Sequence, residues 1–230
     1  MHRKIFSVLG IILLLSVLNS CSSRPEEGLL KRYFSALTLN DRTTLSTMAI
    51  EPISIDAQDG WEIINVTEEE IAPAQLPEMD KKEKELKKNL EDHVGPTLDL
   101  EDAVYEAKEK LKNARTAAAR RAAQSEVDET QAAFDEERER HSQMQKEFND
   151  AAAAARKEEE IAEFSLGAGN LPNIRDLTGD VHSLEVDVRA IGQAGTKDYR
   201  FYLRRYILTD ETLNLTHRGR WIIVKIEPLG

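Results

Sequence analysis

Cysteine is almost missing from this chain, since Cys21 is the only one among 230 residues. An internal disulfide and a zinc or iron–sulfur site built from clustered cysteines are therefore excluded. Aromatic residues are also scarce, at 6%, whereas 32% of the residues are charged, so the chain after its first twenty residues is not a protein with many membrane spans. The formal charge of -11 has the wrong sign for general nucleic-acid binding.

Recognised catalytic motifs are missing too. The chain has no Gly-rich phosphate loop, no HExxH pair and no Gly-x-Ser-x-Gly elbow. Its histidines are scattered rather than grouped, at His2, His93, His141, His182 and His217. We therefore expect a protein that is not an enzyme and that has no cofactor and no metal site.

One long apolar run is present, and it lies at the N-terminus. Two basic residues, Arg3 and Lys4, precede an apolar stretch of about 14 residues that ends at Leu18. This stretch is shorter than the roughly 20 residues of a membrane-spanning helix, so it predicts a cleaved signal peptide rather than a permanent anchor. It leads into Leu18-Asn19-Ser20-Cys21, which resembles the lipobox of bacterial lipoproteins.

The lipobox resemblance implies that residues 1–20 are removed and that Cys21 receives a thioether-linked diacylglycerol. Two or three acyl chains such as palmitate, at about 0.8 kcal/mol per buried methylene, give lasting membrane attachment. The resemblance thus implies a lipid-anchored, periplasm-facing protein of the bacterial cell envelope. Ser22 and Ser23, in place of an aspartate, favour the outer membrane over the inner one. An ordinary secretory signal is the alternative.

Composition divides the rest of the chain into core, insertion and core. Between residues 67 and 164 there are 27 acidic and 16 basic residues, and Gly95 is the only glycine from 67 to 166. We therefore expect a first core part at 21–66, a helical coiled-coil insertion at 67–166 and a second core part at 167–230.

The two core parts predict an α+β fold, with a small core of N-terminal helices packed on a curved antiparallel sheet. Apolar residues from Leu29 to Leu37 recur at helical spacing, and a second short helix ends before Pro52. Alternating or bulky apolar runs predict strands at 61–66, 184–190, 199–208 and 221–226, the last three forming a meander. In the first of these strands, Trp61 and Ile63 alternate with Ile64 and Val66.

The core resembles the nuclear-transport-factor-two-like cone fold. The likeness rests on the segments Tyr33–Leu37, Leu45–Ala49 and Gly219–Val224, and it covers roughly 110 residues. It implies a curved sheet wrapped around a helix, a fold that hosts enzymes, binding modules and scaffolds. Catalytic members place an Asp or His inside the cone, and the candidates here are His182, Asp187, Asp198 and His217. We expect these side chains to be solvated, Asp187 on the polar face of its strand.

The insertion consists mostly of strong helix formers, and Gly95-Pro96 predicts a helix end near His93 and a new start near Asp99. A first heptad seam comprises Leu100, Val104, Ala107, Leu111, Ala114 and Ala118. A second comprises Val127, Thr130, Phe134, His141, Met144, Phe148, Ala151 and Ala155. The two seams are about two residues out of phase, and a capping box at Ser125–Asp128 indicates a reversal near Gln124. We expect an antiparallel hairpin that turns at Gly95 or near Gln124.

These features predict a structural or interaction protein of the cell envelope, whose helical insertion contacts a protein partner or a second copy of the chain. Two alternatives are a periplasmic adaptor-like accessory of a transport system and a cone domain that binds a small molecule. Arg200 and Arg204 alternate with Tyr202 and Tyr206, which suggests either an anion-binding face or cross-strand ion pairs. We expect no nucleic-acid partner.

Overall fold

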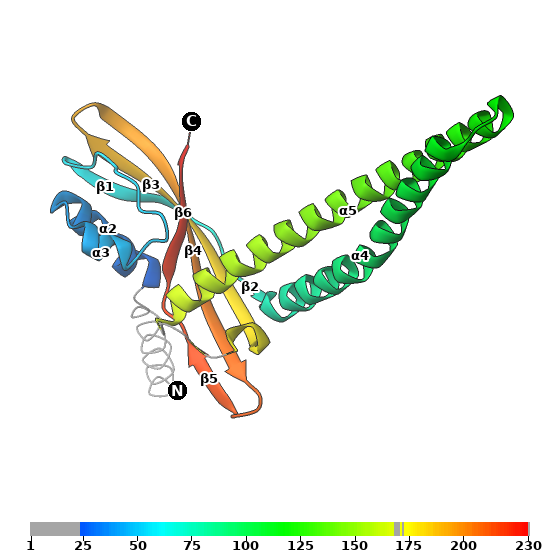
Figure 1. Ribbon diagram of the computed structural model, residues 1–230. Coiled ribbons are helices and arrows are strands. Elements are labelled where there is room, and N and C mark those ends of the chain that lie inside the picture. The colour runs from blue at the N-terminus through cyan, green and yellow to red at the C-terminus, as the bar shows by residue number, and fades with distance from the viewer. Residues whose placement is uncertain (1–23, 168–170, 172, 230) are drawn as a thin grey trace, which may run out of the picture.

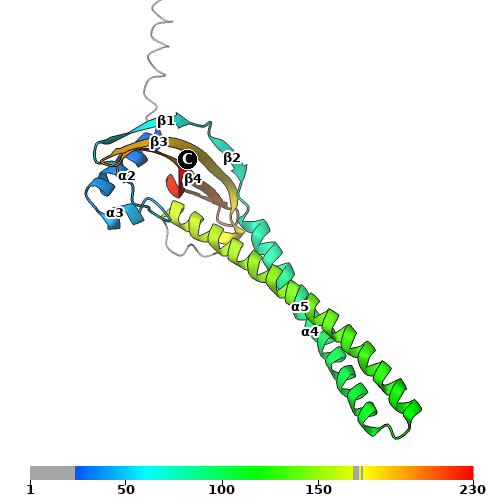
Figure 2. The same cartoon turned by 90° about the horizontal axis from the view of Figure 1, so that it is seen from above.

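The computed structural model describes residues 24–167, 171 and 173–229. The predicted signal peptide, the lipobox and Cys21 lie outside the described residues. The protein is a body of helices and antiparallel sheet from which a long pair of helices projects (Figures 1 and 2). The predicted α+β class is confirmed. Among the described residues, no helix combines the length and the apolar character of a membrane span.

The described residues form a six-stranded antiparallel sheet that is four strands wide. The long strands β3 and β4 pair at its centre. β1 and β2 pair with successive parts of the free edge of β3. β5 and β6 pair with successive parts of the free edge of β4. The bounds are β1 Gly60–Val66, β2 Glu70–Pro73, β3 Thr178–Gly192, β4 Gly195–Asp210, β5 Leu215–Arg218 and β6 Ile222–Leu229. The meander of β3, β4 and β6 matches the expected strands. The strands β2 and β5 were not expected. The residues of β2 lie in the range assigned to the helical insertion, and β5 lies between the strands predicted at 199–208 and 221–226.

A bulge in β1 changes which side chains face the core. The pairing of β1 with β3 shifts between Ile63 and Asn65, which leaves Ile64 as an extra, exposed residue. An extra residue moves every later side chain to the other face of the sheet. Val66 therefore packs against the core, and the prediction that it shares a face with Ile64 was wrong.

Helices α2 (Pro25–Thr38) and α3 (Arg42–Ser46) cover one face of the sheet. In α3, the Asp41 side chain accepts a hydrogen bond from the Thr44 amide at 3.0 Å and so caps the helix. The aromatic side chains form the centre of this first core. The Phe34 and Trp61 rings stack with centroids 4.7 Å apart, and Tyr33 meets Phe201 edge to face at 5.7 Å.

A second core lies on the opposite face. Leu203 and Tyr206 are three positions apart on β4, so their side chains point to opposite faces, and both are almost fully buried. Tyr206 packs between the sheet and the ends of the long helices. The other buried members of this core are Leu76, Ile161, Ala162, Ile174, Leu177, Val181, Leu208 and Ile222. Helices therefore cover the sheet on both faces.

The long helices are α4 (Leu76–Asn113) and α5 (Ala117–Leu166), and we call the pair the hairpin. They lie side by side and reverse at Ala114–Thr116 (Figure 2). Both predicted turn positions, Gly95 and Gln124, are therefore wrong. The Thr116 hydroxyl accepts a hydrogen bond from the Ala119 amide at 3.1 Å, which caps α5 at its start.

Helix α4 continues through Pro96, although an interior proline costs about 3 kcal/mol. Gly95 and Pro96 are exposed, and the Thr97 hydroxyl donates a hydrogen bond to the His93 carbonyl at 3.0 Å. The helix bends along its length (Figure 1), as a proline kink requires. The seam continues past the proline without a change of phase, and packing against α5 along this seam stabilises the helix.

Both predicted seams are buried or half-buried between α4 and α5, except Ala118. Ala118 is exposed because it lies beyond the turn. The phase difference between the seams follows from the same turn, since each seam belongs to its own helix. Ala123 adds a further buried position at the start of the second seam.

Candidate functional site: the root and tip of the hairpin

The hairpin is joined to the sheet through Ser165, in the last turn of α5. The buried Ser165 hydroxyl donates to the Arg220 carbonyl at 2.8 Å and accepts from the Tyr206 amide at 3.1 Å. The Arg220 amide in turn donates to the Ser165 carbonyl at 2.9 Å. Gly219 makes room for this contact, because a Cβ there would lie 2.4 Å from the Ser165 Oγ. We call this junction, with the two ion-pair groups described next, the root.

Glu158 forms the second contact of the root. The Tyr206 hydroxyl donates to Glu158 Oε1 at 2.6 Å, and Arg204 Nη1 lies 3.2 Å from Oε2. Burial raises the pKa of the Tyr206 hydroxyl, and the hydrogen bond to Glu158 raises it further. Burial opposes the charge of Arg204, but Tyr206 and Glu158 outweigh burial and raise its pKa. Arg204 therefore belongs to the root and is not free for an anion.

Arg175 forms the third contact, from the short helix η1 (Ile174–Asp176). Its guanidinium donates to Glu83 of α4 at 2.6 Å and to Glu159 of α5 at 2.8 Å. Burial opposes its charge, but the hydrogen bonds to Glu159 and Glu83 raise its pKa overall. One side chain thus holds both helices against the body, and the root fixes the direction of the hairpin.

The seam of the hairpin contains a polar layer near its middle. His93 Nε2 lies 2.9 Å from Glu137 Oε1, within ion-pair distance but not aligned as a hydrogen bond. The His93 and His141 rings lie 5.7 Å apart, and Arg140 lies 3.0 Å from Glu137. The described residues contain no group of three or more His, Cys, Asp or Glu side chains placed to hold a metal ion, this layer included.

The far end of the hairpin is basic, in contrast to the rest of it. We define the tip as residues 110–124, which hold five basic residues and no acidic one. The basic residues are Lys110, Lys112, Arg115, Arg120 and Arg121, and all five are exposed. The rest of the hairpin, which we call the shaft (residues 76–109 and 125–166), has 24 acidic and 11 basic residues. Charge is therefore segregated along the length of the hairpin.

Three arginines of the tip are available for an anionic partner. Among the described residues, no carboxylate lies within ion-pair distance of Arg115, Arg120 or Arg121, whereas Lys110 pairs with Glu126 at 2.6 Å. Arg120 Nε donates to the Ala114 carbonyl at 3.1 Å. Beside these cations is a shallow, largely apolar hollow of about 790 Å³. Its lining includes the exposed Tyr105, alanines of the turn and of α5, and the glutamates 106, 109 and 126.

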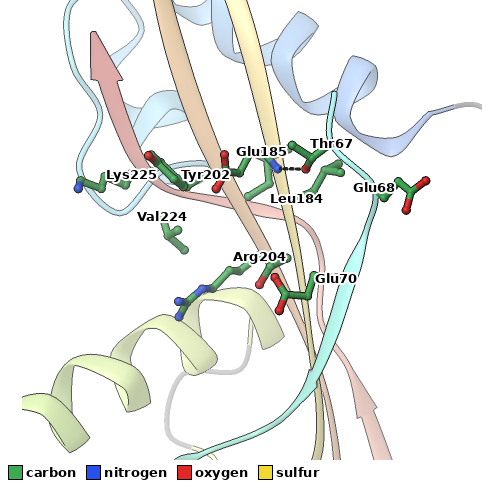
Figure 3. A pocket seen from close by; sticks show the side chains of 11 residues that line it. Thr67, Glu68, Glu70, Leu184, Glu185, Tyr202, Arg204, Val224 and Lys225 are labelled. Atoms are coloured by element: carbon green, nitrogen blue, oxygen red, sulfur yellow. Dashed lines mark hydrogen bonds between the residues drawn. The ribbon is translucent and has the colours of Figure 1, made fainter. Parts of the chain in front are cut away.

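A groove of about 500 Å³ lies on the sheet next to the root, between the approach to β2 and β6 (Figure 3). Its lining includes Glu70, Glu185, Tyr202, Arg204 and Lys225. Arg204 points toward α5 (Figure 3), where it pairs with Glu158, and Lys225 pairs with Glu227. Because both cations already have carboxylate partners, the groove offers no free cation to a ligand.

The predicted candidates of the sheet take part in cross-strand pairs. Arg200 donates two hydrogen bonds to Asp187, at 2.7 and 3.1 Å, and Arg189 donates two to Asp198, at 2.9 and 3.0 Å. Each arginine lowers the pKa of its aspartate. The expectation that Asp187 is solvated was wrong, since its side chain is only 14% exposed. Cross-strand pairing therefore accounts for Arg200.

His182 is the other candidate that the sheet buries. Its Nδ1 lies 2.5 Å from Glu69, and Arg205 lies 3.3 Å from both groups. His217 lies apart, on the edge strand β5 opposite Leu208. Sequence reasoning did not connect Glu69 or Arg205 with His182, because their approach to His182 depends on the register of β2, β3 and β4.

Comparison with known proteins finds no match: no family model, no curated protein and no solved structure is significantly similar to this chain.

Proposed function

We propose that this protein is a lipid-anchored interaction protein of the bacterial cell envelope that presents the tip of its hairpin at a fixed distance from its body. The observation that carries this proposal is a long hairpin whose root is held to the sheet by hydrogen bonds and ion pairs. At 1.5 Å per residue, the 50 residues of α5 span about 75 Å. A projection of this length serves to reach something that the body does not touch.

The anchor is part of the same proposal. Diacylglycerol on Cys21, with removal of residues 1–20, would attach the chain just before its first described helix. That helix, α2, lies in the body, at the opposite end of the molecule from the tip (Figure 2). An anchored body would therefore leave the hairpin free to extend into the periplasm. The outer membrane is the location that we propose for the anchor.

We further propose that the protein acts without catalysis. Asp187 and Asp198, two of the side chains that the sequence offered as catalytic candidates, form cross-strand ion pairs, and such pairs stabilise strand pairing. The groove beside the root is the observation that favours the alternative of a small-molecule binder, but its cations are already neutralised.

Two experiments on the full chain in cells test this function. The first feeds labelled palmitate to cells that express the wild type or Cys21→Ser. We expect label in the wild type only, and an unlabelled wild type would contradict the anchor.

The second experiment places a photo-crosslinking residue at Ala118, in the tip, or at Ala154, an exposed control position on α5 near the root. We expect crosslinks to another envelope component from Ala118 and not from Ala154. Equal or absent crosslinking at the two positions would contradict a role for the tip.

A further inference from the structure

We propose that the tip binds, by electrostatic attraction, the surface of a bilayer rich in anionic phospholipids. This inference deepens the proposed function by naming the partner class of the tip. The ligand chemistry is that of phosphate headgroups, which arginine and lysine recognise by charge-assisted hydrogen bonds. Four observations on the tip and shaft support it.

The first observation is the arrangement of charge. The tip holds five exposed cations, on the end of α4, the turn and the start of α5. Lys110 and Lys112 pair with Glu126 and Glu109, whereas the three arginines have no carboxylate partner among the described residues. These cations come from two helices and the turn between them rather than from one helix alone. An end covered with cations fits a broad anionic surface better than it fits a single acidic group.

The second observation is the net charge of the shaft, which is -13. An anionic surface repels the shaft and attracts the tip, so the hairpin is held end-on rather than flat. The screening length is about 10 Å at 0.1 M salt, which is much shorter than the hairpin. Each part of the hairpin therefore responds to the surface only where it approaches closely.

The third observation is the small area of the end. Two adjacent helices, each about 10 Å across, present an end of about 200 Å². A stable protein–protein interface buries about 800 Å² on each partner. A membrane surface needs no such area, because each basic side chain near it contributes its own attraction. The end-on geometry thus favours a lipid surface over a folded protein.

The fourth observation is the nature of the side chains between the cations. They are mostly alanine, at positions 114, 117, 118, 119, 122 and 123. Alanine does not hold the arginines away from a flat surface, and it is too small to insert into the hydrocarbon. Binding should therefore be reversible and strongly dependent on salt.

The test uses the mature chain, residues 21–230, with Cys21→Ser to remove the acyl anchor. Flotation with vesicles of phosphatidylglycerol and phosphatidylcholine in equal parts is compared with flotation with phosphatidylcholine alone. We expect binding to the anionic vesicles at about 0.05 M salt and its loss at about 1 M salt. No binding to the anionic vesicles at low salt would overturn the inference.

A pair of matched variants locates the contact. Arg120→Gln with Arg121→Gln removes two cations from the tip, and Lys81→Gln with Lys82→Gln removes two exposed cations near the root. At about fivefold per cation, the tip variant should partition roughly 25-fold more weakly, and the root variant should match the parent chain. Circular dichroism is the control that both variants remain helical. Equal losses in the two variants would overturn the inference.

A third arm separates a lipid partner from a protein partner. Soluble polyglutamate is added as a competitor at a charge concentration equal to that of the vesicle lipid. We expect it to displace little of the protein, and full displacement would point to an acidic polypeptide instead. Because the test chain carries no acyl group, failure here leaves the palmitate result intact, and failure of palmitate labelling leaves the vesicle result intact.

Discussion

The Ser165 hydroxyl lies 2.8 Å from the Arg220 carbonyl and joins the last turn of α5 to the loop that precedes β6. This contact brings together two residues that are 55 positions apart in the chain. Ser165 is buried, and Gly219 is the residue that allows the helix to come so close. The direction of the hairpin therefore depends on a very small region of the sheet.

Gly219→Ala should destabilise the protein. The new methyl group would lie 2.4 Å from Ser165 Oγ and 2.8 Å from the Tyr206 carbonyl, so the helix end must move. We expect a loss of about 1 to 3 kcal/mol in the free energy of unfolding, measured by chemical denaturation. Gly28→Ala is the control, because nothing lies near its Cβ position in α2, and it should stabilise the protein by up to about 1 kcal/mol. Equal stability of the two variants would show that the root is loose.

Arg175→Met should loosen the root. It removes the cation that Glu83 and Glu159 share and that also lies 3.7 Å from Asp80, and it leaves these carboxylates without their common partner. We expect a loss of about 1 to 2 kcal/mol and faster amide hydrogen exchange at the body ends of α4 and α5. Arg156→Met, which breaks an exposed pair with Glu160, should leave exchange unchanged. Unchanged exchange in Arg175→Met would contradict a clamping role.

Pro96→Ala should stabilise the hairpin. Alanine restores the backbone donor that proline lacks and removes its clash with the preceding turn. We expect the free energy of unfolding to rise by up to about 3 kcal/mol and the bend of α4 to decrease, which a spin-label distance along α4 would measure. Pro77 lies in the first turn of α4, where no such donor is needed, so Pro77→Ala should change little. A decrease in stability for Pro96→Ala would mean that the bend itself is required.

Asp187→Asn should lower stability at neutral pH and flatten its dependence on acid. Two hydrogen bonds from Arg200 lower the pKa of Asp187 in the folded protein, so the pair stabilises the fold above about pH 3.9, the ordinary value for aspartate. This stabilisation is lost as the pH falls through the lower, folded value. In denaturation experiments, the difference between wild type and variant should be constant from about pH 5 to 7 and should shrink below about pH 4. Asp150→Asn, an exposed control, should show no such difference at any pH.

The sequence predicted the parts of the fold that depend on periodicity. Heptad spacing identified both seams, from Leu100 to Ala114 and from Val127 to Ala155, and alternation identified the strands of the meander. The turn of the hairpin was missed because its one local signal is the cap at Thr116, while Gly95-Pro96 is a stronger local signal. Helix α4 nevertheless continues through Gly95-Pro96, because its seam packs against α5 along its length. The residues around Gly95 do not by themselves reveal this packing.

The candidate site was predicted less well than the fold. A basic tip follows from the composition of residues 110–124 only when the turn is placed between the two helices that carry it. The pairing of Arg175 with Glu83 joins residues 92 positions apart, and no periodicity encodes it. The bulge at Ile64 is likewise a property of strand pairing and not of the alternation within β1.

Because the hairpin is fixed at its root, a rotation there moves the tip. A lever of about 75 Å converts a rotation of about 5° at its fixed end into a displacement of about 7 Å at its free end. A small shift of a side chain that packs beneath α5 could thus move the tip by more than the pitch of an α-helix, which is about 5.4 Å. A small change in the sheet at the root should therefore produce its largest displacement at the tip.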